Sequence, residues 1–339
     1  MVLPGDKSES IAAAADCIRA GGLLGLPTET VYGLAANADD DLAVAQIFQA
    51  KGRPADHPLI VHVADASAVA HYAAAMPEFA RLLIQAFWPG PLTLILTRQP
   101  GVANAAAGGN PTIGLRCPSH PVAHVLLTAL KKGSVWGLAA PSANQFGRVS
   151  PTTAAHVQGE FGDDLLILDG GSCSVGIEST IIDCTRGAPV LLRPGAITPE
   201  QLQAVCGLRV LSKDELVSPA TPVPKASGTL DSHYAPRARV KLMTAGDLQR
   251  AVDILGAEKQ SSAVSDCLQV AAYSRALMNP SSESILYRRM PDDAAATAQQ
   301  LFAVLREMDA QGVNEIWIET PPSDPEWDGV RDRLQRAAG

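Results

Sequence analysis

The sequence predicts an α/β protein whose main sheet is mixed, and three observations lead to this class. Short apolar runs with strand character alternate with helical segments along residues 1–206. Several of the late runs, between 165 and 193, follow one another directly, which disfavours a purely doubly wound parallel sheet. A second alternation of strand and helix follows a Pro-rich interval. We therefore expect a twisted mixed sheet in one domain and a smaller α/β domain after it.

The elements of the first domain follow from apolar periodicity and from helix ends. Acidic residues open the segment 40–50, where a helix N-terminus favours negative charge, and Gly21 and Gly22 end the first helix. Short runs of Val, Ile, Leu and Thr indicate buried strands. Helices are predicted at 8–22, 40–50, 66–86 with a break near Pro77, 121–131 and 199–205. Strands are predicted at 23–26, 59–63, 92–97, 112–116, 135–140, 165–169, 179–183 and 189–193.

Proline content marks a boundary after the first domain. Pro219, Pro222, Pro224 and Pro236 fall in a stretch with little periodicity, which is typical of a linker. The expected division is a first domain at 1–206, a linker at 207–236 and a small C-terminal α/β domain at 237–339. Within the last domain we expect strands at 240–244, 270–274, 285–289 and 316–320, and helices at 246–256 and 292–309.

Composition sets the broad class of protein. The chain has 339 residues, 47% of them hydrophobic, and a net charge of −8 from 27 Lys and Arg against 35 Asp and Glu. This charge disfavours a broad nucleic-acid surface, so any bound phosphate must be met by a few focused cations. Six cysteines without C-x-x-C spacing indicate free thiols rather than a zinc or redox pair. Without an apolar run of ~18 residues or a signal-like N-terminus, we expect a cytoplasmic protein that crosses no membrane.

The stretch PTETVYGLAANA, residues 27–38, carries more polar groups than a turn requires. Thr28, Glu29, Thr30 and Tyr32 fall within five positions. One threonine hydroxyl could cap a helix, but a cap does not account for the other groups. We therefore predict that this segment contributes to a binding site.

A second segment gathers cations. Lys51, Arg53 and His57 lie within seven residues, in a loop stiffened by Pro54 and Pro58. An Arg fork and a Lys point charge suit phosphate oxygens. The alternative is a solvated loop, which is weakened because the cations precede a buried strand in an acidic protein.

Two further side chains leave their roles open on sequence alone. His62 lies within the strand that follows the cation loop, where a lone histidine is more often a satisfied core or edge group. Arg116 ends an apolar strand before a Pro-containing turn, and a surface position and a ligand-binding position are about equally expected for it. The turn at Pro89, Gly90 and Pro91 is predicted to be structural.

The segment APSANQFGRVSPTT, residues 140–153, follows a strand directly. Its small residues, with Ser142, Asn144 and Ser150, let backbone N–H groups approach a ligand closely. Ser150 could instead cap the next helix, with Pro151 at its first position. The nearby segments 176–183 and 191–195 add Glu178, Ser179 and Arg193.

Several well-known catalytic patterns are missing from the sequence. It contains no G-x-x-x-x-G-K-[ST], G-x-G-x-x-G, H-E-x-x-H or G-x-S-x-G. A standard P-loop ATPase, dinucleotide enzyme, zincin or serine hydrolase is therefore not expected.

Taken together, the polar segments resemble one family. PTETVYGL, KGRP with HPLIVH, FWPGPLT, GLRCPSHP, PSAN, ESTIID and LLRPG occur in that order. They resemble the YrdC-type L-threonylcarbamoyladenylate synthases over roughly residues 10–200. The segment SGTLDSHYAP, 227–236, resembles the linker of the long two-domain form, from which Ala226, Ser227 and Thr229 depart.

The resemblance implies a fold, a reaction and a set of binding residues. The family fold is a twisted sheet around a deep, positively lined cavity. The reaction converts L-threonine, bicarbonate and ATP, expected with Mg²⁺, into L-threonylcarbamoyl-AMP and pyrophosphate. The residues implied to bind L-threonine are Thr30, His62, Arg116, Ala140 and Ser179. The residues implied to bind ATP are Lys51, Arg53, His57, Thr112, Ser142, Asn144, Ser150 and Arg193, with His233 and Tyr234 covering the nucleotide from the linker.

The implied chemistry needs no enzyme nucleophile and no metal ligand from the protein. Threonine becomes a carbamate that attacks the α-phosphorus, so the enzyme contributes positioning and charge stabilisation. The product would pass to a tRNA threonylcarbamoyl transferase complex, with at most a weak tRNA contact by this chain. Two alternatives remain at this stage: a carbamoyltransferase-related enzyme, and a non-catalytic module that binds double-stranded RNA or tRNA.

Overall fold

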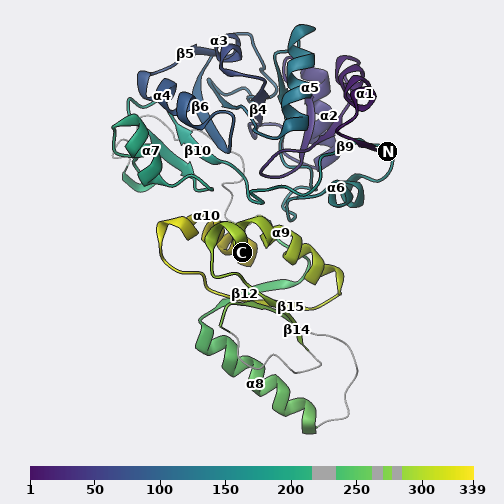
Figure 1. The fold of residues 1–339 in the computed structure, drawn as a ribbon, viewed down its shortest axis with the longest axis vertical. Helices are drawn as coiled ribbons and strands as arrows, with labels where there is room; N and C mark the ends of the chain where they lie inside the picture. The colour runs from purple at the N-terminus through teal and green to yellow at the C-terminus, as the bar shows by residue number, and fades with distance from the viewer. Residues whose placement is uncertain (216–233, 262–269, 277–284) are drawn as a thin grey trace. The chain divides into compact units, whose positions relative to one another are not determined.

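The structure is a computed structural model that describes residues 1–215, 234–261, 270–276 and 285–339 (Figure 1). The chain forms two compact units. Unit 1 comprises Met1–Phe146 and Ser150–Thr229, and unit 2 comprises Gly147–Val149 and Leu230–Gly339. Most of the predicted linker, including His233, lies outside the described residues.

Unit 1 is built on one mixed sheet of 11 strands. The order across the sheet is β1-β9-β2-β3-β8-β4-β7-β6-β10-β11, and β5 pairs with β6. Parallel pairs such as β4 with β7 adjoin antiparallel pairs such as β6 with β7. The predicted mixed sheet is therefore confirmed. The strands are β1 Val2–Pro4, β2 Leu24–Leu26, β3 Gly33–Asn37, β4 Ile60–Val63, β5 Ala73–Ala75, β6 Leu92–Arg98, β7 Thr112–Arg116, β8 Gly137–Ala139, β9 Leu166–Asp169, β10 Thr180–Asp183 and β11 Val190–Arg193.

Helices cover the sheet of unit 1 unevenly. The α-helices are α1 Ser8–Arg19, α2 Asp41–Lys51, α3 Val69–Tyr72, α4 Glu78–Phe87, α5 Pro121–Lys132, α6 Ala154–Phe161 and α7 Pro199–Cys206, and short 3₁₀ turns are η1 Ala66–Ala68 and η2 Lys213–Glu215. The largest core joins α2, α4 and α7 to inward side chains of β4, β6 and β7. A second core joins α1 and α5 to β2, β8 and β9 (Figure 1). On the rest of that second face, over β6, β10 and β11, the described apolar residues form a small cluster of Ile95, Ile181, Val190 and Leu192.

Tertiary pairing overrides local preference at three places in unit 1. The predicted helical stretch at 66–86 with a break near Pro77 is confirmed at 66–72 and Glu78–Phe87, but it is wrong at Ala73–Ala75, which forms β5 against β6 and separates α3 from α4. Alanine has high helix propensity, but a strand edge offers these residues a ladder. Strands β1 and β3 are additional to the prediction. Both gain their order from distant partners, because β1 pairs with β9 and β3 lies between β2 and β8.

Unit 2 is a three-layer α/β unit with its own core. Its four parallel strands run in the order β12-β15-β13-β14, with bounds β12 Arg239–Met243, β13 Val270–Ser274, β14 Ile285–Arg289 and β15 Glu315–Glu319. Helices α9 Ala294–Ala310 and α10 Asp328–Ala338 lie on one face and α8 Ala245–Ser261 on the other, and η3 spans Pro325–Trp327 (Figure 1). The predicted strands and two of the helices are confirmed, and α10 was not predicted. On the α8 face, Leu248 and Val252 pack against Trp317.

Helix α2 carries a defined N-cap that allows a test of the local structure. The Asp40 carboxylate accepts hydrogen bonds from the backbone N–H groups of Leu42 and Ala43 at 3.0 and 3.1 Å. Replacing an N-cap of this kind with Ala costs about 1 kcal/mol. We predict that Asp40→Ala lowers the free energy of unfolding by about that amount, measured by urea denaturation. Asp6→Ala is the control, because Asp6 is exposed and lies 3.7 Å from Lys7, and it should leave the value unchanged.

Candidate active site

The strand register places one polar row across the second face of the unit 1 sheet. His62 of β4 lies opposite Arg116 of β7. Extending the register of β7 with β6 by one residue brings Thr93 opposite Arg116. Thr93 in turn pairs with Ile181 of β10, which pairs with Arg193 of β11. Residues directly opposite one another point to the same face of a sheet. The side chains of His62, Thr93, Arg116 and Arg193 therefore share one face.

Arg116 lies at the centre of this row and is buried, with 3% of its surface exposed. Its Nη1 donates to the Thr30 hydroxyl at 2.8 Å, and its Nε donates to the Gly90 carbonyl at 3.3 Å. Its Nη2 lies 2.8 Å from a carboxylate oxygen of Glu29. The structure therefore decides between the two positions expected for Arg116 in favour of a buried cation, which requires such partners.

The segment 27–32 forms a hydrogen-bonded turn beside Arg116. The Thr28 hydroxyl donates to the Val31 carbonyl at 2.6 Å and accepts from the backbone N–H groups of Thr30 and Val31. The hydroxyls of Thr28 and Thr30 lie 3.0 Å apart. No helix begins here, so the alternative of a helix cap is wrong. The turn instead fixes the Thr30 hydroxyl between Thr28 and Arg116.

His62 is buried and uncharged. Burial and, secondarily, the charge of Arg116 lower the pKa of His62 to about 3. Its Nδ1 has no hydrogen-bond partner among the described residues. A buried polar atom without a partner is uncommon and points to a group that the protein binds. A backbone hydrogen bond with Ile60 acts against the lowering of the His62 pKa, so the imidazole has one local partner while Nδ1 has none among the described residues.

Ser179 and Arg193 form a second polar group on the same face. The Arg193 guanidinium donates to the Ser179 carbonyl from Nε at 3.0 Å and from Nη2 at 2.9 Å, and Nη2 also lies 3.1 Å from the Ser179 hydroxyl. That hydroxyl lies 2.7 Å from the hydroxyl of Thr93. Arg193, Ser179 and Thr93 are thus linked directly, and the sheet register brings them next to Arg116.

The loop after β8 is anchored from α2. The Lys51 ammonium donates to the carbonyls of Ser142, at 2.6 Å, and Asn144. Burial and, to a smaller extent, the charge of Arg53 lower the pKa of Lys51 to about 7, against an opposing effect of Glu160. Lys51 thus holds the predicted ATP loop in place. An ammonium has three N–H donors, so these two bonds leave one for a further acceptor.

The other predicted ATP residues lie around this loop and along β7. Arg53 donates to the Pro58 carbonyl at 3.2 Å and its guanidinium lies 6.0 Å from the ring of Phe146. The His57 ring lies 5.9 Å from the same ring. Thr112 begins β7 at the end opposite Arg116, about 13 Å away on the same face.

Ser150 does not cap a helix. Its hydroxyl donates to the buried carboxylate of Glu178. Helix α6 begins later and is capped by Thr153, whose hydroxyl accepts from the backbone N–H of His156 at 3.2 Å. The alternative of Ser150 as the N-cap is therefore wrong.

The remaining predicted residues divide between the site and other parts of the chain. Ala140 follows β8, and its N–H donates to the Ile60 carbonyl at 3.0 Å. Tyr234 lies in unit 2, where its buried ring is 5.4 Å from that of Phe302 and 5.4 Å from the guanidinium carbon of Arg333. A nucleotide contact for Tyr234 stays a prediction.

Three polar residues at the site received no role from the sequence. They are Glu29, Glu178 and Thr93, all buried. Glu29 lies in the polar stretch 27–38, but its ion-pair partner, Arg116, is far away in the chain. The signal for Thr93 is weaker, because a threonine within a strand is ordinary.

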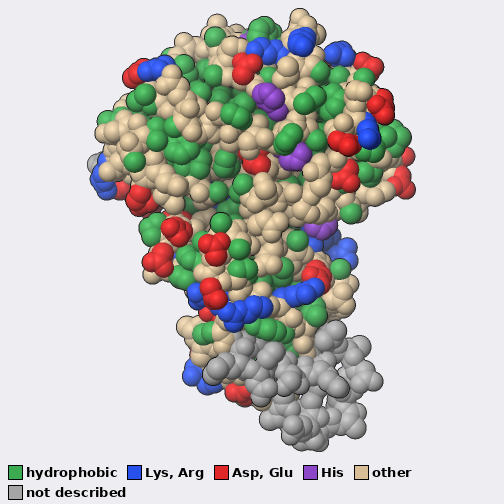
Figure 2. Space-filling view, viewed as in Figure 1, with side chains coloured by type: hydrophobic (Ala, Val, Ile, Leu, Met, Phe, Trp, Pro, Cys, Tyr) green, Lys and Arg blue, Asp and Glu red, His purple; other side chains and the backbone are tan. Residues whose placement is uncertain are grey.

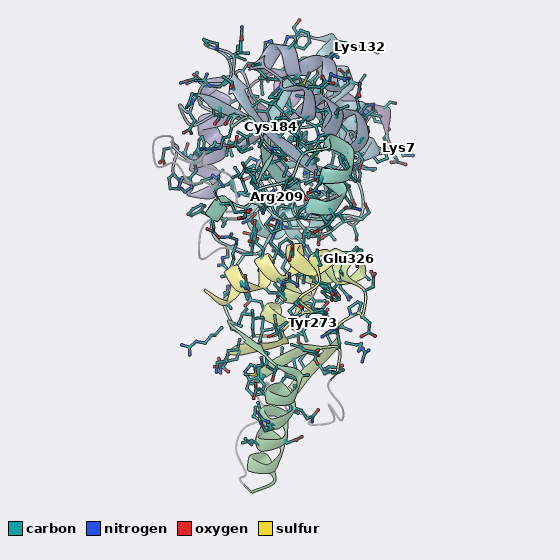
Figure 3. All side chains as sticks on the ribbon, turned by 90° about the vertical axis from the view of Figure 1, so that its left-hand side faces the viewer. Lys7, Lys132, Cys184, Arg209, Tyr273 and Glu326 are labelled. Atoms are coloured by element: carbon teal, nitrogen blue, oxygen red, sulfur yellow. The ribbon has the colours of Figure 1, made fainter. Side chains whose placement is uncertain are left out.

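Three cysteine thiols of unit 1 are buried and therefore hard to ionise. Burial raises the pKa of Cys117 to about 11 and that of Cys173 to about 12, and the pKa of Cys184, which lies inside the unit (Figure 3), is raised further. Among the described residues no cluster of three or more His, Cys, Asp or Glu is placed to hold a metal ion.

None of the described helices has the length and apolar character needed to cross a membrane.

Comparisons with known proteins assign the whole chain. Residues 16–195 match the Sua5, YciO and YrdC family, described as telomere recombination, and residues 197–339 match the threonylcarbamoyl-AMP synthase C-terminal domain. The threonylcarbamoyl-AMP synthase of Pyrococcus abyssi is 38% identical over 97% of this chain and 94% of its own length. The chain belongs to the Sua5-type threonylcarbamoyl-AMP synthases. The enzyme of that name from Bacillus subtilis is 37% identical over 97% of this chain and 93% of its own.

Solved Sua5 structures have the same fold over the full chain. Pyrococcus abyssi Sua5 complexed with L-threonine matches with a TM-score of 0.86 and 36% identity, covering 100% of this chain and 97% of that one. A variant of the same Sua5, with a His and a Tyr each replaced by Ala, matches with a TM-score of 0.87. As a Sua5-type synthase, the chain is an enzyme of tRNA threonylcarbamoyladenosine biosynthesis, in place of the RNA-binding and carbamoyltransferase alternatives.

The buried, neutral His62 of this Sua5-type synthase predicts a dependence of stability on pH. Its pKa is about 3 in the fold and 6.5 ordinarily, so the unfolded chain takes up a proton first as the pH falls. The stabilisation is complete above 6.5 and is lost toward 3. Between about pH 6 and pH 4, wild type should lose up to ~1.4 kcal/mol per pH unit more than His62→Gln.

The measurement for His62 is urea denaturation across this pH range. His124→Gln is the control, since His124 is exposed, and its pH slope should equal that of wild type. Equal slopes for His62→Gln and wild type would contradict a neutral buried His62.

Proposed function

We propose that the polar row of unit 1 is the site at which this synthase joins L-threonine, bicarbonate and ATP into L-threonylcarbamoyl-AMP and pyrophosphate. The observation that carries the proposal is the buried Arg116 guanidinium, held beside the Thr30 hydroxyl and the His62 Nδ1, which has no hydrogen-bond partner among the described residues. A zwitterionic amino acid with a hydroxyl needs a cation and small polar groups of this kind. The Pyrococcus abyssi Sua5 structure with L-threonine supports the same ligand for this chain.

L-Threonine is proposed to bind at the Arg116 end of the row. Arg116 would take the substrate carboxylate bidentately, since its planar fork matches that geometry. Thr30 retains acceptor capacity for the substrate hydroxyl, and neutral His62 can donate or accept there. The Ala140 backbone and Ser179 would complete the pocket.

ATP is proposed to extend from Arg193 toward the loop that Lys51 anchors. Arg53, Arg193 and Lys51 supply focused positive charge, and Ser142, Asn144, Ser150, His57 and Thr112 supply the polar groups around it. Arg193 donates to the Ser179 carbonyl, so the proposed nucleotide and threonine groups are in direct contact. That adjacency is what attack by a threonine carbamate on the α-phosphorus requires.

The deep basic cavity implied by the family is proposed for this face of the sheet. Gly114 lies between Thr112 and Arg116 on β7 and places no side chain on this face, which supports the proposal. On the face drawn in Figure 2, acidic and basic side chains of unit 1 are scattered among apolar ones, which supports cations that are focused inside the site.

The chemistry is proposed to rest on positioning. The threonine amine becomes a carbamate, the carbamate oxygen attacks the α-phosphorus and pyrophosphate leaves, while the buried cations stabilise the charge. The donors near the proposed triphosphate are cationic, so they fit phosphate oxygens and not a metal ion. Mg²⁺ would therefore arrive on the triphosphate and spread its charge.

The remaining parts of the proposal concern the linker and the partners. Residues 207–236 are proposed as a lid between a catalytic domain at 1–206 and a small domain at 237–339, with His233 and Tyr234 covering the nucleotide. A lid would protect a carbamate that is labile in water. The product is proposed to pass to a tRNA threonylcarbamoyl transferase complex, with at most weak tRNA contact and no membrane, in the cytoplasm.

Threonine recognition by its hydroxyl is the main test of the proposed function. A site built to bond a hydroxyl rejects an analogue that lacks it, because its own polar groups are left unpaired. Pyrophosphate release should be fastest with threonine, intermediate with serine and slowest with 2-aminobutyrate. Equal rates for threonine and 2-aminobutyrate, or release that does not depend on the amino acid, would overturn the assignment.

The phosphate role of Arg53 is tested by ATP affinity. Arg53→Ala removes a charge-assisted contact, so ATP binding measured by calorimetry should weaken by about 1.5–3 kcal/mol. Arg81→Ala is the matched control, because it removes the same charge from an exposed pair with Glu78. Unchanged affinity in Arg53→Ala, or equal losses in the two variants, would count against the role.

A further inference from the structure

Glu29 is a buried carboxylate whose place at the site is not explained by the turn that carries it. Only 4% of its surface is exposed, and neither carboxylate oxygen accepts a hydrogen bond from a described residue. Its backbone is fixed, because its carbonyl accepts from the Val175 N–H at 2.7 Å. A buried carboxylate ordinarily accepts several hydrogen bonds, so this side chain is held in a place where its own protein leaves acceptor capacity unused.

The groups that surround Glu29 narrow what it can bind. Arg116 is its ion-pair partner at 2.8 Å. The nearby polar groups of His120 and Cys117 are directed to the carbonyls of Gly170, at 3.2 Å, and Ala64, at 3.3 Å. A cationic donor from a ligand would therefore satisfy Glu29.

An adjacent Arg and Glu complement an amino-acid zwitterion. The α-carboxylate and α-ammonium of an amino acid are attached to one carbon, so the groups that bind them must be neighbours. We propose that Glu29 accepts the α-ammonium of the amino-acid substrate while Arg116 takes its carboxylate, and that Glu29 then receives the proton that carbamate formation releases. This proposal rests on the proposed function of the same site.

The proton transfer is required by the chemistry of the first step. An ammonium has no free electron pair, so nitrogen must lose a proton before it can attack the carbon of bicarbonate or of the CO₂ derived from it. In balance, R–NH₃⁺, HCO₃⁻ and the Glu29 carboxylate give R–NH–COO⁻, water and the protonated Glu29 carboxyl. The new bond is N–C, a C–O bond of bicarbonate breaks, and its oxygen leaves as water. A base positioned at the nitrogen accelerates such a step by about a hundredfold or more.

Glu29 also keeps Arg116 ready in the absence of substrate. The carboxylate of Glu29 occupies the cation that the substrate carboxylate would take, so the buried charge of Arg116 is paired within the protein. When threonine binds, its carboxylate pairs with Arg116 and its ammonium pairs with Glu29, in place of the pair between Arg116 and Glu29. A zwitterion has no net charge, so the total charge in the pocket is unchanged. This exchange limits the electrostatic cost of binding a charged substrate in a buried site.

Ligand-binding measurements can show whether Glu29 binds the substrate ammonium or only holds Arg116 in place. The probes are threonine and 2,3-dihydroxybutyrate, which keeps the carboxylate and β-hydroxyl and has a hydroxyl in place of the ammonium. Calorimetry on the full chain should show wild type preferring threonine by about tenfold or more, and Glu29→Gln should lose that preference. If Glu29→Gln binds both ligands equally more weakly and keeps the preference, Glu29 is only a support for Arg116 and the proposal fails.

The direction of the reaction supplies a second test. Threonylcarbamoyl-AMP and pyrophosphate form ATP in the reverse step, which breaks and makes bonds at phosphorus and needs no proton from the amine. Glu29→Gln should lose forward synthesis by about a hundredfold and keep reverse ATP formation within a few fold. Equal losses in the two directions would overturn the proton role.

Matched variants complete the design. Asp183→Asn removes another fully buried carboxylate of unit 1, also 2.8 Å from an arginine, Arg186, and should leave the forward-to-reverse ratio unchanged. If Glu29→Gln does not fold, Glu29→Asp keeps the charge and withdraws the carboxylate by one methylene, and it should weaken threonine more than dihydroxybutyrate. A wild type that forms no pyrophosphate with threonine refutes the proposed function itself, whereas retained discrimination in both Glu29 variants refutes only this inference.

Discussion

The rest of the site depends on the ion pair and hydrogen bonds of the buried Arg116 guanidinium. A cation taken out of water is tolerated only with an opposite charge and hydrogen-bond acceptors close to it. Glu29, Thr30 and Gly90 supply these from two separate loops. The turn at 27–32, the turn before β6 and the end of β7 are therefore tied to one side chain, and displacing any of them leaves a buried charge unpaired.

The sheet register extends this constraint across the face. His62, Arg116 and Thr93 lie in one row because β4, β7 and β6 pair without a bulge there. Thr93 then contacts Ser179, and Ser179 contacts Arg193, so the row that contains Arg116 is joined to Arg193 through two hydroxyls. A rigid ladder can hold such groups within hydrogen-bond distance more precisely than loops can. The proposed threonine and ATP ends of the site thereby share one scaffold.

Unit 2 is stabilised by contacts of its own. Tyr234 and Phe302 form a ring contact beside the buried Arg333, and Glu319 accepts from Ser274 and Arg275 at the ends of two neighbouring strands. Tyr273 is buried within this unit (Figure 3). The match of residues 197–339 to the C-terminal domain of the synthases agrees with a separately packed α/β unit. The ring contact and the hydrogen bonds of Glu319 lie within unit 2, which gives the unit a core of its own.

By itself the sequence determined the mixed α/β class, most of the long strands and helices, and the segments in which the candidate site residues occur. Periodicity and turn residues act over a few positions, so Ile60–Val63, Leu92–Arg98 and Ala294–Ala310 were predictable from neighbours alone. Tertiary structure decided that Ala73–Ala75 is a strand, that Thr28 closes a turn and not a helix, and that Glu29 meets Arg116. Those outcomes depend on partners many residues away, and the energy of pairing with them outweighs local propensity. The sequence around a residue does not show which distant residue will be its partner.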